Sequence, residues 1–591
     1  MFLRYTTRRK NGKEHRYYSL VENRRLPGGR ILQRPVLYLG EINDSQEEAW
    51  RKTIEIFEEG QTRARTVALF PEERVGPVAD ADIVRLRLRE LSLHRPRQWG
   101  GCWLAVYLWE QLELSAFWAQ RLPPSRKGTR WDGVLQTLVT YRLLDPGSEW
   151  RLYRHWFEHS AMADLLAGDA GLAEIHKLYA CHERLLEHKR ELFSHLRQRW
   201  QDLFNVRFEV LLYDLTSTYF ESDPPFPEGD KRRYGYSRDK RPDCVQVVIA
   251  LIVTPEGFPL AYEVLAGNTS DKKTLAEFLQ KIEDQYGQAE RIWVMDRGIP
   301  TEAVLQQMRQ TQPPIQYLVG TPRGRLSRYQ AKLLNQPWQV VHEGVSVKLL
   351  QEDQELYVLA ESKDRVNKER AMRWRQLKGL CRRLKTLQQQ TLKRDALLKK
   401  VGAALHQFPA AARLLAVTVA PDSASLSFRL RQDKLLQARQ REGRYLLRSN
   451  ITHGRSPEEL WRFYIQLTEV EAAFKNLKDD LALRPIHHQL EHRIEAHILI
   501  SFLAYCLQVT LRRRLRDLAP GLTARAVLEK FATLQMLDVH LPTTDQRTVV
   551  LSRYTQPEAD VRLLLQRLKL ELPPQPPPKI MAPKTPSDPS V

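Results

Sequence analysis

Between residues 206 and 320 the chain carries a series of short β-branched and aromatic runs, and this series constrains the fold more than any other feature. RFEVLLYDLTSTYF, CVQVVIALIVT and FPLAYEVLAG have the length and composition of strands. A helical segment (272–287), the strand RIWVMDRG, a second helix (TEAVLQQMRQ) and the strand PIQYLVGTP follow. This order predicts a mixed α/β domain built around one sheet, with three strands followed by a helix, a strand, a helix and a strand.

The rest of the chain divides by composition and periodicity into further segments. The α/β pattern stops near 324 and resumes at 446, where a long helical region leads to 515. The predicted units are a small β-rich module (1–75), a helical domain (76–205), the α/β domain in two pieces (206–324 and 446–515), an insertion that is β-rich and then basic and helical (325–445), a C-terminal helical segment (516–572) and a disordered Pro-rich tail (573–591).

Composition excludes several classes of protein. No apolar run approaches the ~20 residues of a membrane-spanning helix, and the N-terminus lacks the apolar core of a secretory signal. The five cysteines are scattered without a Cys-x-x-Cys pair, which argues against a disulfide framework and a structural zinc site. We therefore expect a cytoplasmic protein with no membrane partner.

The net charge of +21 points to an anionic partner. Nucleic acid is the common one; an anionic membrane surface is the rival, but no amphipathic anchor supports it. A merely basic protein is the plainer alternative. Residues 361–400 hold fourteen Lys or Arg against four acids, and a further basic cluster spans 231–242. This clustering favours nucleic acid.

Two aspartates stand out because of the strands that carry them. Asp214 lies within a run that otherwise looks buried, where a carboxylate is costly unless it is paired or bound to a cation. Asp296 ends the strand IWVMD, and ligand sites of α/β sheets collect beyond the carboxyl ends of strands. The alternative is that Asp214 caps a turn and Asp296 caps the following helix.

A third carboxylate lies on a predicted helix over 462–481, whose apolar residues follow the rhythm of a buried face. Tyr464, Glu471 and Lys478 are spaced seven apart, so each is rotated by only ~20° from the one before, and they form a line about 20 Å long. The alternative is a solvated rim with an ordinary Glu471–Lys475 pair. Helical spacing alone favours that alternative.

Three carboxylates suit phosphodiester cleavage by divalent metal ions. Mg²⁺ prefers oxygen ligands and keeps several waters, so a few carboxylates and a substrate phosphate suffice. No Gly-x-Ser-x-Gly elbow, P-loop or His-Glu-x-x-His motif is present. His487 and His488 are not expected to form a metal pair, because adjacent side chains on a helix or strand diverge.

The residues that carry these acids resemble a known family. YDLTSTYFE (213–221), the stretch 235–271 and VMDRGI (294–299) resemble the catalytic domain of DDE transposases from bacterial insertion sequences, and 464–505 is similar to the end of that domain. The spacing of Tyr464, Glu471 and Lys478 resembles the Tyr-Arg-Glu-Lys signature of the insertion-sequence-four group. Leu467 stands at the position of the arginine, which is a departure from that signature.

The resemblance implies a ribonuclease-H-like catalytic domain with a β-rich insertion. It implies that Asp214, Asp296 and Glu471 bind two Mg²⁺ ions, with Mn²⁺ as a substitute, for nicking at transposon ends and attack of the 3′-hydroxyl on target DNA. Tyr464 and Lys478 would contact phosphates, and Arg462 or Lys475 would replace the missing arginine. Thr216, Arg297 and residues 237–239 lie close in sequence to the motifs that carry the resemblance. This proximity is the only reason to consider them as site residues, and we do not place them in the site.

Expectations about partners follow from this reading. A transposase would work as a homodimer on double-stranded DNA, with its terminal inverted repeats bound by the helical domain (76–205) and by basic parts of the insertion. In a bacterium it would associate with the nucleoid. One alternative is a catalytically impaired or domesticated DNA-binding protein derived from a transposase, for which Leu467 leaves room. Another is a nuclease that uses the same site without joining strands.

Overall fold

A computed structural model describes most of the chain. The described residues are 2–10, 13–25, 31–42, 86–222, 224–239, 241–269, 271–286, 291–296, 299–321, 336–421 and 424–581, with the single positions 46, 50, 329, 332 and 333. Arg297 and most of 43–85, which includes the end of the predicted N-terminal module, lie outside them.

One mixed sheet of nine strands forms the centre of the catalytic half of the molecule. Its order is β10-β11-β12-β15-β9-β8-β5-β6-β7. The five strands predicted between 206 and 320 are present: β5 (Val210–Phe220), β6 (Val245–Val253), β7 (Pro259–Ala266), β8 (Ile292–Met295) and β9 (Gln316–Gly320), with α9 (Asp271–Tyr286) and α10 (Glu302–Gln310) between them. The α/β prediction is confirmed for this part.

The pairing within these five strands follows from their composition. Every residue of β6 is buried, as expected for a Val- and Ile-rich run covered on both faces. β6 lies antiparallel between β5 and β7, whereas β8 runs parallel to both β5 and β9. The crossovers through α9 and α10 allow these parallel pairs, because parallel neighbours cannot be joined by a tight turn.

The predicted insertion does not form a separate β module. Its strands β10 (Gln339–His342), β11 (Val345–Glu352) and β12 (Glu355–Ser362) continue the catalytic sheet through β15 (Arg444–Ser449), which pairs antiparallel with β12 and β9. The predicted boundary at 446 therefore falls inside β15. Sequence periodicity could not reveal this, since the pairing joins strands far apart in the chain.

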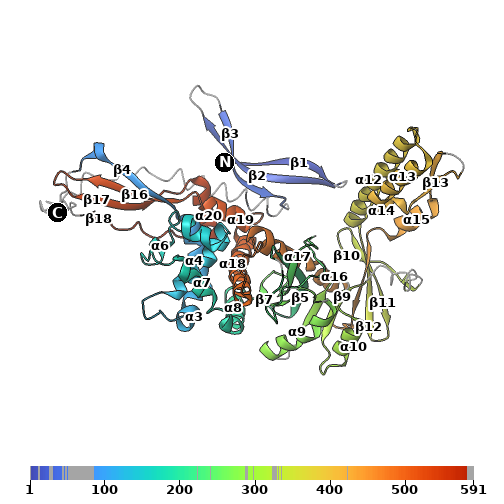
Figure 1. Ribbon diagram of the computed structural model, residues 1–591, viewed down its shortest axis with the longest axis horizontal. Helices are drawn as coiled ribbons and strands as arrows, with labels where there is room; N and C mark the ends of the chain where they lie inside the picture. Colours follow the sequence, from blue (N-terminus) through green and yellow to red (C-terminus); the bar gives the residue numbers. More distant parts are fainter. Residues whose placement is uncertain are drawn as a thin grey trace.

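Only the helical part of the insertion has a core of its own. It consists of α12 (Lys363–Gln388), α13 (Arg394–Gln407), α14 (Pro409–Ala412), β13 (Leu415–Val419), β14 (Leu426–Leu430) and α15 (Gln432–Arg441). Leu380, Leu384 and Leu397 are buried in a cluster distinct from the main core. In Figure 1 this helical unit projects from one end of the molecule.

A long helix joins the sheet to the helical domain. α18 (Glu491–Leu518) is long and apolar enough to span a membrane by length and composition, with a mean hydropathy of 1.6 in its most apolar window, but 89% of that window is buried inside the protein. Its Thr510 hydroxyl accepts a hydrogen bond from Trp200, and its Tyr505 hydroxyl donates one to the carbonyl of Gly257. α18 thus has the burial of a core helix.

The helical domain packs around α18 (Figure 1). It contains α2 (Gly100–Gln111), α3 (Leu114–Arg121), α4 (Trp131–Leu144), α5 (Glu149–Arg151), η3 (Leu152–Trp156), α6 (Met162–Leu165), α7 (Ile175–His182), η4 (Leu186–His188) and α8 (Lys189–Phe204). Large aromatic side chains, among them Trp109, Trp118 and Trp200, are almost completely buried there.

The C-terminal segment differs from its prediction as a helical unit. It holds α19 (Ala524–Phe531) and α20 (Ala559–Leu568), but also β16 (Gln535–Pro542) and β17 (Thr548–Tyr554). These strands form a four-stranded sheet with β18 (Lys579–Met581) and with β4 (Ser92–Gln98), which follows η2 (Leu88–Glu90) within the segment predicted to be helical. The pairing of β4 with β16 joins residues more than 400 positions apart, so it could not be predicted from the local pattern of the sequence.

The Pro-rich tail is ordered over its first part, which corrects the prediction of disorder for 573–591. β18 pairs with β17, and the Tyr554 hydroxyl donates a hydrogen bond to the carbonyl of Pro573. Residues 582–591 lie outside the described residues. The prolines of this part (573, 574 and 576–578) precede β18, so none of them removes a donor from its pairing with β17.

The N-terminal residues form the expected β sheet. β1 (Phe2–Lys10), β2 (Lys13–Arg25) and β3 (Ile31–Gly40) are consecutive antiparallel strands. Trp50 donates a hydrogen bond of 2.7 Å to the carbonyl of Pro520, just beyond α18. This contact connects the N-terminal region to the central helix.

Candidate active site

Asp214 and Asp296 lie on neighbouring parallel strands. The pairing of β5 with β8 ends at Tyr213 opposite Met295, so the next residue on each strand is one of the two aspartates. β8 ends there, whereas β5 continues to Phe220 beside β6. The carboxyl end of β8 therefore places both carboxylates at the same edge, at the spacing of adjacent strands (about 4.8 Å).

Glu471 reaches this edge from a helix that lies over β5. Ser456 and Glu459 form a capping box that starts α16 (Pro457–Ile465), with Pro457 in its first turn. α17 (Leu467–Lys475) follows after Gln466, and a π-helical turn, η5 (Asn476–Asp480), ends it. α17 packs through buried residues such as Val470 and Phe474 and contacts β5.

The three acids line one cavity of about 290 Å³, here called the triad cavity. Asp214 is half-buried, and Asp296 and Glu471 are exposed. The remaining lining residues are Thr321, Arg365, Arg444, Tyr445, Leu446, Tyr464, Ile465, Leu467, Thr468 and Val470. The strand context indicated Asp214 and Asp296, the family resemblance added Glu471, and the fold places the three acids around one cavity.

The electrostatics of the triad cavity favour a bound cation. The pKa of the Asp214 carboxyl is raised to about 7. Burial is the largest cause of this rise, and the negative charges of Asp296 and Glu471 raise the pKa further. The N–H of Leu215 and the guanidinium of Arg238 lower the pKa and offset part of the rise. Three carboxylates with room for water fit the oxygen-rich, partly hydrated coordination of Mg²⁺.

Tyr464 lies beside the triad, as its spacing from Glu471 predicts. Its hydroxyl donates a long hydrogen bond of 3.5 Å to Oδ1 of Asp296. Its ring stacks on Tyr445, with 5.8 Å between centroids, and the Tyr445 hydroxyl accepts a hydrogen bond from Trp461. Stacking orients the Tyr464 ring and directs its hydroxyl toward the site.

Lys478 does not line the triad cavity, whereas Tyr464 and Glu471, the residues fourteen and seven positions before it, do. The π-helical turn follows α17, and the ammonium group of Lys478 lies 2.8 Å from Oδ1 of Asp239. Arg484 holds the same oxygen at 2.6 Å. Burial lowers the pKa of Lys478, partly offset by Asp239. The pair is buried, so the ammonium group of Lys478 has an internal partner, and its predicted contact with a phosphate stays a prediction.

The segment 237–239, excluded from the site on sequence grounds, borders it. The backbone N–H of Arg238 donates to the Ser217 hydroxyl of β5, and the guanidinium of Arg238 lowers the pKa of Asp214. Asp239 anchors Lys478. The basic run 231–242 was the available signal, but its fold over β5 could not be read from the sequence.

Two arginines of the insertion line the triad cavity, and these are not the ones expected. Arg462 and Lys475 are exposed on α16 and α17 and are not among its lining residues, whereas Arg365 and Arg444 are. Leu467 lines the cavity at 8% exposure, so its side chain occupies the place where the family arginine is expected. The richness of 361–400 in basic residues was noticed, but no single residue was selected from it.

A larger groove of about 1120 Å³ adjoins the triad cavity, and we call it the basic groove. Arg365, Arg444 and Tyr445 line both spaces. Its other basic residues come mainly from α12 and α15: Lys368, Arg373, Arg413, Lys434 and Arg441. Three acids (Asp364, Glu369 and Glu442) also line it, so cations are in excess.

Comparisons with known proteins identify the family of the chain. Residues 207–507, more than half of the chain, match the family model described as "Transposase DDE domain", and residues 3–66 match "IS1634 family transposase, N-terminal domain". The chain is also similar to a solved structure titled "Cryo-EM structure of piggyBac transposase synaptic complex with hairpin DNA (SNHP)", with a TM-score of 0.33 and 9% identity over 73% of this chain and 79% of that one. No curated protein matches.

Proposed function

Because this chain belongs to the transposases that carry a DDE domain, we propose that Asp214, Asp296 and Glu471 are its metal-binding catalytic carboxylates. The protein is a polynucleotidyl transferase of DNA transposition that uses divalent metal ions. The observation that carries the assignment is that these three acids, which come from two strands and a helix far apart in the chain, line one cavity at the carboxyl end of β8.

The strand order supports a ribonuclease-H-like catalytic domain. β7, β6, β5, β8 and β9 are adjacent in that order, with only β6 antiparallel to its neighbours. Two Mg²⁺ ions held by the triad would activate the attacking water or 3′-hydroxyl and stabilise the leaving oxygen. Mn²⁺, which also accepts oxygen ligands, would substitute.

The side chains around the triad have separate tasks in this proposal. Asp214 accepts a metal ion in place of the proton that burial favours. Tyr464 contacts Asp296 and orients that carboxylate or a phosphate oxygen. Arg365 and Arg444 supply the positive charge that the signature of the insertion-sequence-four group assigns to the position of Leu467. Lys478 helps to position the 237–239 segment over β5.

The basic groove offers a path for DNA that leads into the triad cavity. Its guanidinium and ammonium groups would contact phosphates, which position the duplex without reading its sequence. Two transposon ends must be held together for joining, so we propose that a homodimer acts on paired ends.

The proposal is tested with purified full-length protein and DNA that carries the ends of its element. We expect nicks at the element boundary with Mg²⁺ or Mn²⁺ and none without metal. D214N, D296A and E471Q should each abolish nicking while retaining DNA binding. H487A changes an exposed residue outside the triad cavity and is the matched control. Persistent metal-dependent nicking by D296A would refute the triad.

A second measurement separates a transposase from the impaired protein considered above. Pre-nicked ends with a free 3′-hydroxyl should become covalently joined to a supercoiled target plasmid. Nicking without any joined product would leave a nuclease, and binding with neither product would indicate a non-catalytic DNA-binding protein.

A further inference from the structure

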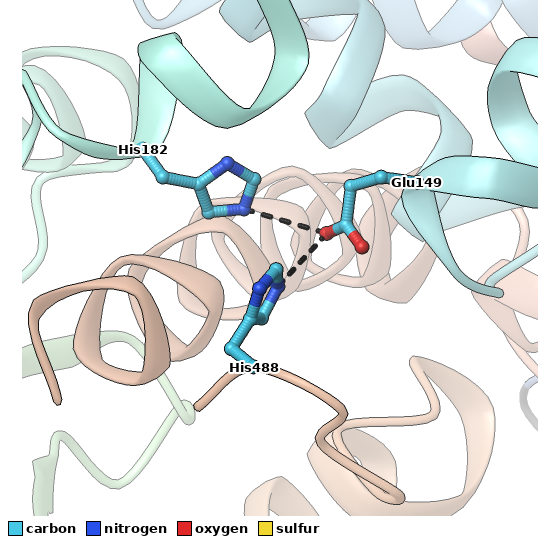
Figure 2. A group of neighbouring side chains, drawn as sticks. All are labelled: Glu149, His182 and His488. Atoms are coloured by element: carbon cyan, nitrogen blue, oxygen red, sulfur yellow. Dashed lines mark hydrogen bonds and ion pairs between the residues drawn. The ribbon is translucent and has the colours of Figure 1, made fainter. Parts of the chain in front are cut away.

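A buried cluster of one carboxylate and two imidazoles lies where the helical domain meets the segment after Glu471. Glu149 begins α5, His182 ends α7, and His488 lies in the loop before α18 (Figure 2). Their exposures are 6%, 0% and 7%. None is among the residues that line the triad cavity. The proposed activity therefore leaves this cluster unexplained.

The spacing of the donor atoms matches a tetrahedral metal site. Oε1 of Glu149 lies 3.4 Å from Nε2 of His182 and 3.2 Å from Nε2 of His488. A tetrahedral ion with bonds of ~2.0–2.1 Å separates its ligands by about 3.3–3.4 Å. Charge-assisted hydrogen bonds are shorter, at about 2.7–2.9 Å. The observed distances are therefore closer to the edges of a coordination tetrahedron.

The hydrogen bond of His182 indicates which of its nitrogens is available. Nδ1 lies 2.8 Å from the carbonyl oxygen of Leu178, an atom that can only accept, so Nδ1 carries the hydrogen. A neutral ring then directs the lone pair of Nε2 at the carboxylate of Glu149, and two acceptors face each other. Either a metal ion between them or a second proton on His182 makes this contact favourable. Metal-bound histidines commonly donate their second N–H to a carbonyl in this way.

A third imidazole lies near the same carboxylate oxygen. His497 on α18 is 4% exposed, and its Nδ1 lies 3.8 Å from Oε1 of Glu149. Neither ring nitrogen of His497 has a hydrogen-bond partner in the described part of the chain. Buried imidazole nitrogens without partners are costly. A metal ion would provide His497 with the partner it lacks.

We propose that Glu149, His182, His488 and His497 bind one Zn²⁺ ion that joins the helical domain to the segment between Glu471 and α18. Imidazole nitrogens suit Zn²⁺, whereas Mg²⁺ and Ca²⁺ require oxygen donors. The buried guanidinium of Arg142 also interacts with Glu149 and repels any cation at the cluster, so binding would depend on the bonds from the imidazole nitrogens. Four protein ligands complete the coordination, as in structural sites.

The bridging position gives the ion a structural role. Glu149 and His182 come from the helical domain, whereas His488 and His497 follow η5 and belong to the region that carries Glu471. Binding would thus stabilise the folded chain in proportion to zinc occupancy, since the unfolded chain has no preformed site.

The test measures the metal content of the full-length protein purified after expression with added zinc, in the D296A background so that the triad cavity contributes little. We expect one zinc per chain by mass spectrometry of the elements. H182Q and H488A should lose it. H487A, which changes the exposed neighbour of His488, should keep it.

Two further measurements need no cluster variant. Cobalt substituted for zinc should give the intense visible absorption of a tetrahedral site, and a chelator should lower the melting temperature until Zn²⁺, but not Mg²⁺, restores it. The proposal is overturned if the protein contains no transition metal and shows no tetrahedral cobalt spectrum. The cluster would then hold a shared proton in place of a metal ion. Equal zinc in H488A and H487A would also overturn the proposal.

Discussion

At Asp214, burial and two neighbouring carboxylates hold a carboxyl group in its neutral form at a pH where it would be ionised in water. The raised pKa has two opposite consequences. In the metal-free protein the folded state retains a proton that the unfolded state has lost between about pH 4 and pH 7, so this group lowers stability as pH rises through that window. Metal binding requires the ionised carboxylate and therefore strengthens over the same rise.

The first prediction concerns this pH dependence. The Mg²⁺ concentration that half-saturates nicking should fall as pH increases from 6 to 8. In metal-free buffer without a chelator, the melting temperature of the wild-type protein should fall as pH rises from 4 to 7. The fall should be smaller in D214N, because asparagine does not titrate. An identical slope in wild-type protein and D214N would contradict the assignment of the shifted pKa to Asp214.

The second prediction concerns the buried ion pair of Asp239. D239N leaves Lys478 and Arg484 facing each other without a carboxylate, and breaking a buried pair in this way costs about 3–5 kcal/mol. K478M should cost less, because Arg484 still neutralises Asp239. Urea unfolding measures both. E529A, which breaks the exposed pair with Arg525, is the control and should cost less than ~1 kcal/mol.

At the scale of elements, the insertion contributes to the site through α12 and β15. Arg365 stacks over Tyr445 at 4.8 Å, and Arg444 pairs with Glu361 of β12 at 2.6 Å. Both residues line the triad cavity and the basic groove. The insertion is thus part of the candidate site, and the positive charge at the site comes from elements other than those that carry the acids.

The third prediction follows from this division. R365A combined with R444A should reduce nicking at least tenfold, and each lost phosphate contact should reduce the slope of log affinity against log salt concentration by about 1. R462A combined with K475A removes the same charge outside the triad cavity and should leave nicking near the wild-type rate. Equal losses in the two double variants would show that only overall charge matters.

At the scale of the whole molecule, the catalytic domain and the strands of the insertion share one sheet. Arg448 of β15 lies 2.5 Å from Glu355 of β12 and 2.5 Å from Glu302 of α10. Arg309 also lies near Glu355, at 2.6 Å. These ion pairs connect β15 with β12 and with α10.

The fourth prediction is that the sheet unfolds as a unit. R448M removes charged hydrogen bonds to Glu302 and Glu355, but Arg309 still neutralises Glu355, so the change should cost about 1.5–3 kcal/mol. Hydrogen exchange should accelerate together in β8, β9 and β12. R429M, an exposed change on β14 in the separate core of the insertion, should leave their exchange unchanged. Faster exchange in β12 alone would indicate that the insertion strands open independently.

The sequence by itself determined the local features. Composition and period identified β5 to β9, because β-branched runs interrupted by helices have few other folds, and the cost of a charge in a strand identified Asp214. Asp296 followed from a strand end, whereas Glu471 was distinguished from an ordinary position on a helix only by the family resemblance. Their roles as metal ligands stay predictions, although they line one cavity with Asp214.

Only the tertiary structure decided which distant residues meet. Arg97 and Asp538 pair across 441 residues, Lys478 and Asp239 across 239, and Glu149 and His488 across 339. It also showed that the insertion extends the catalytic sheet and supplies Arg365 to the triad cavity. Such contacts leave no periodic signal in the sequence, because strand pairing and side-chain neutralisation depend on positions in space that local pattern does not encode.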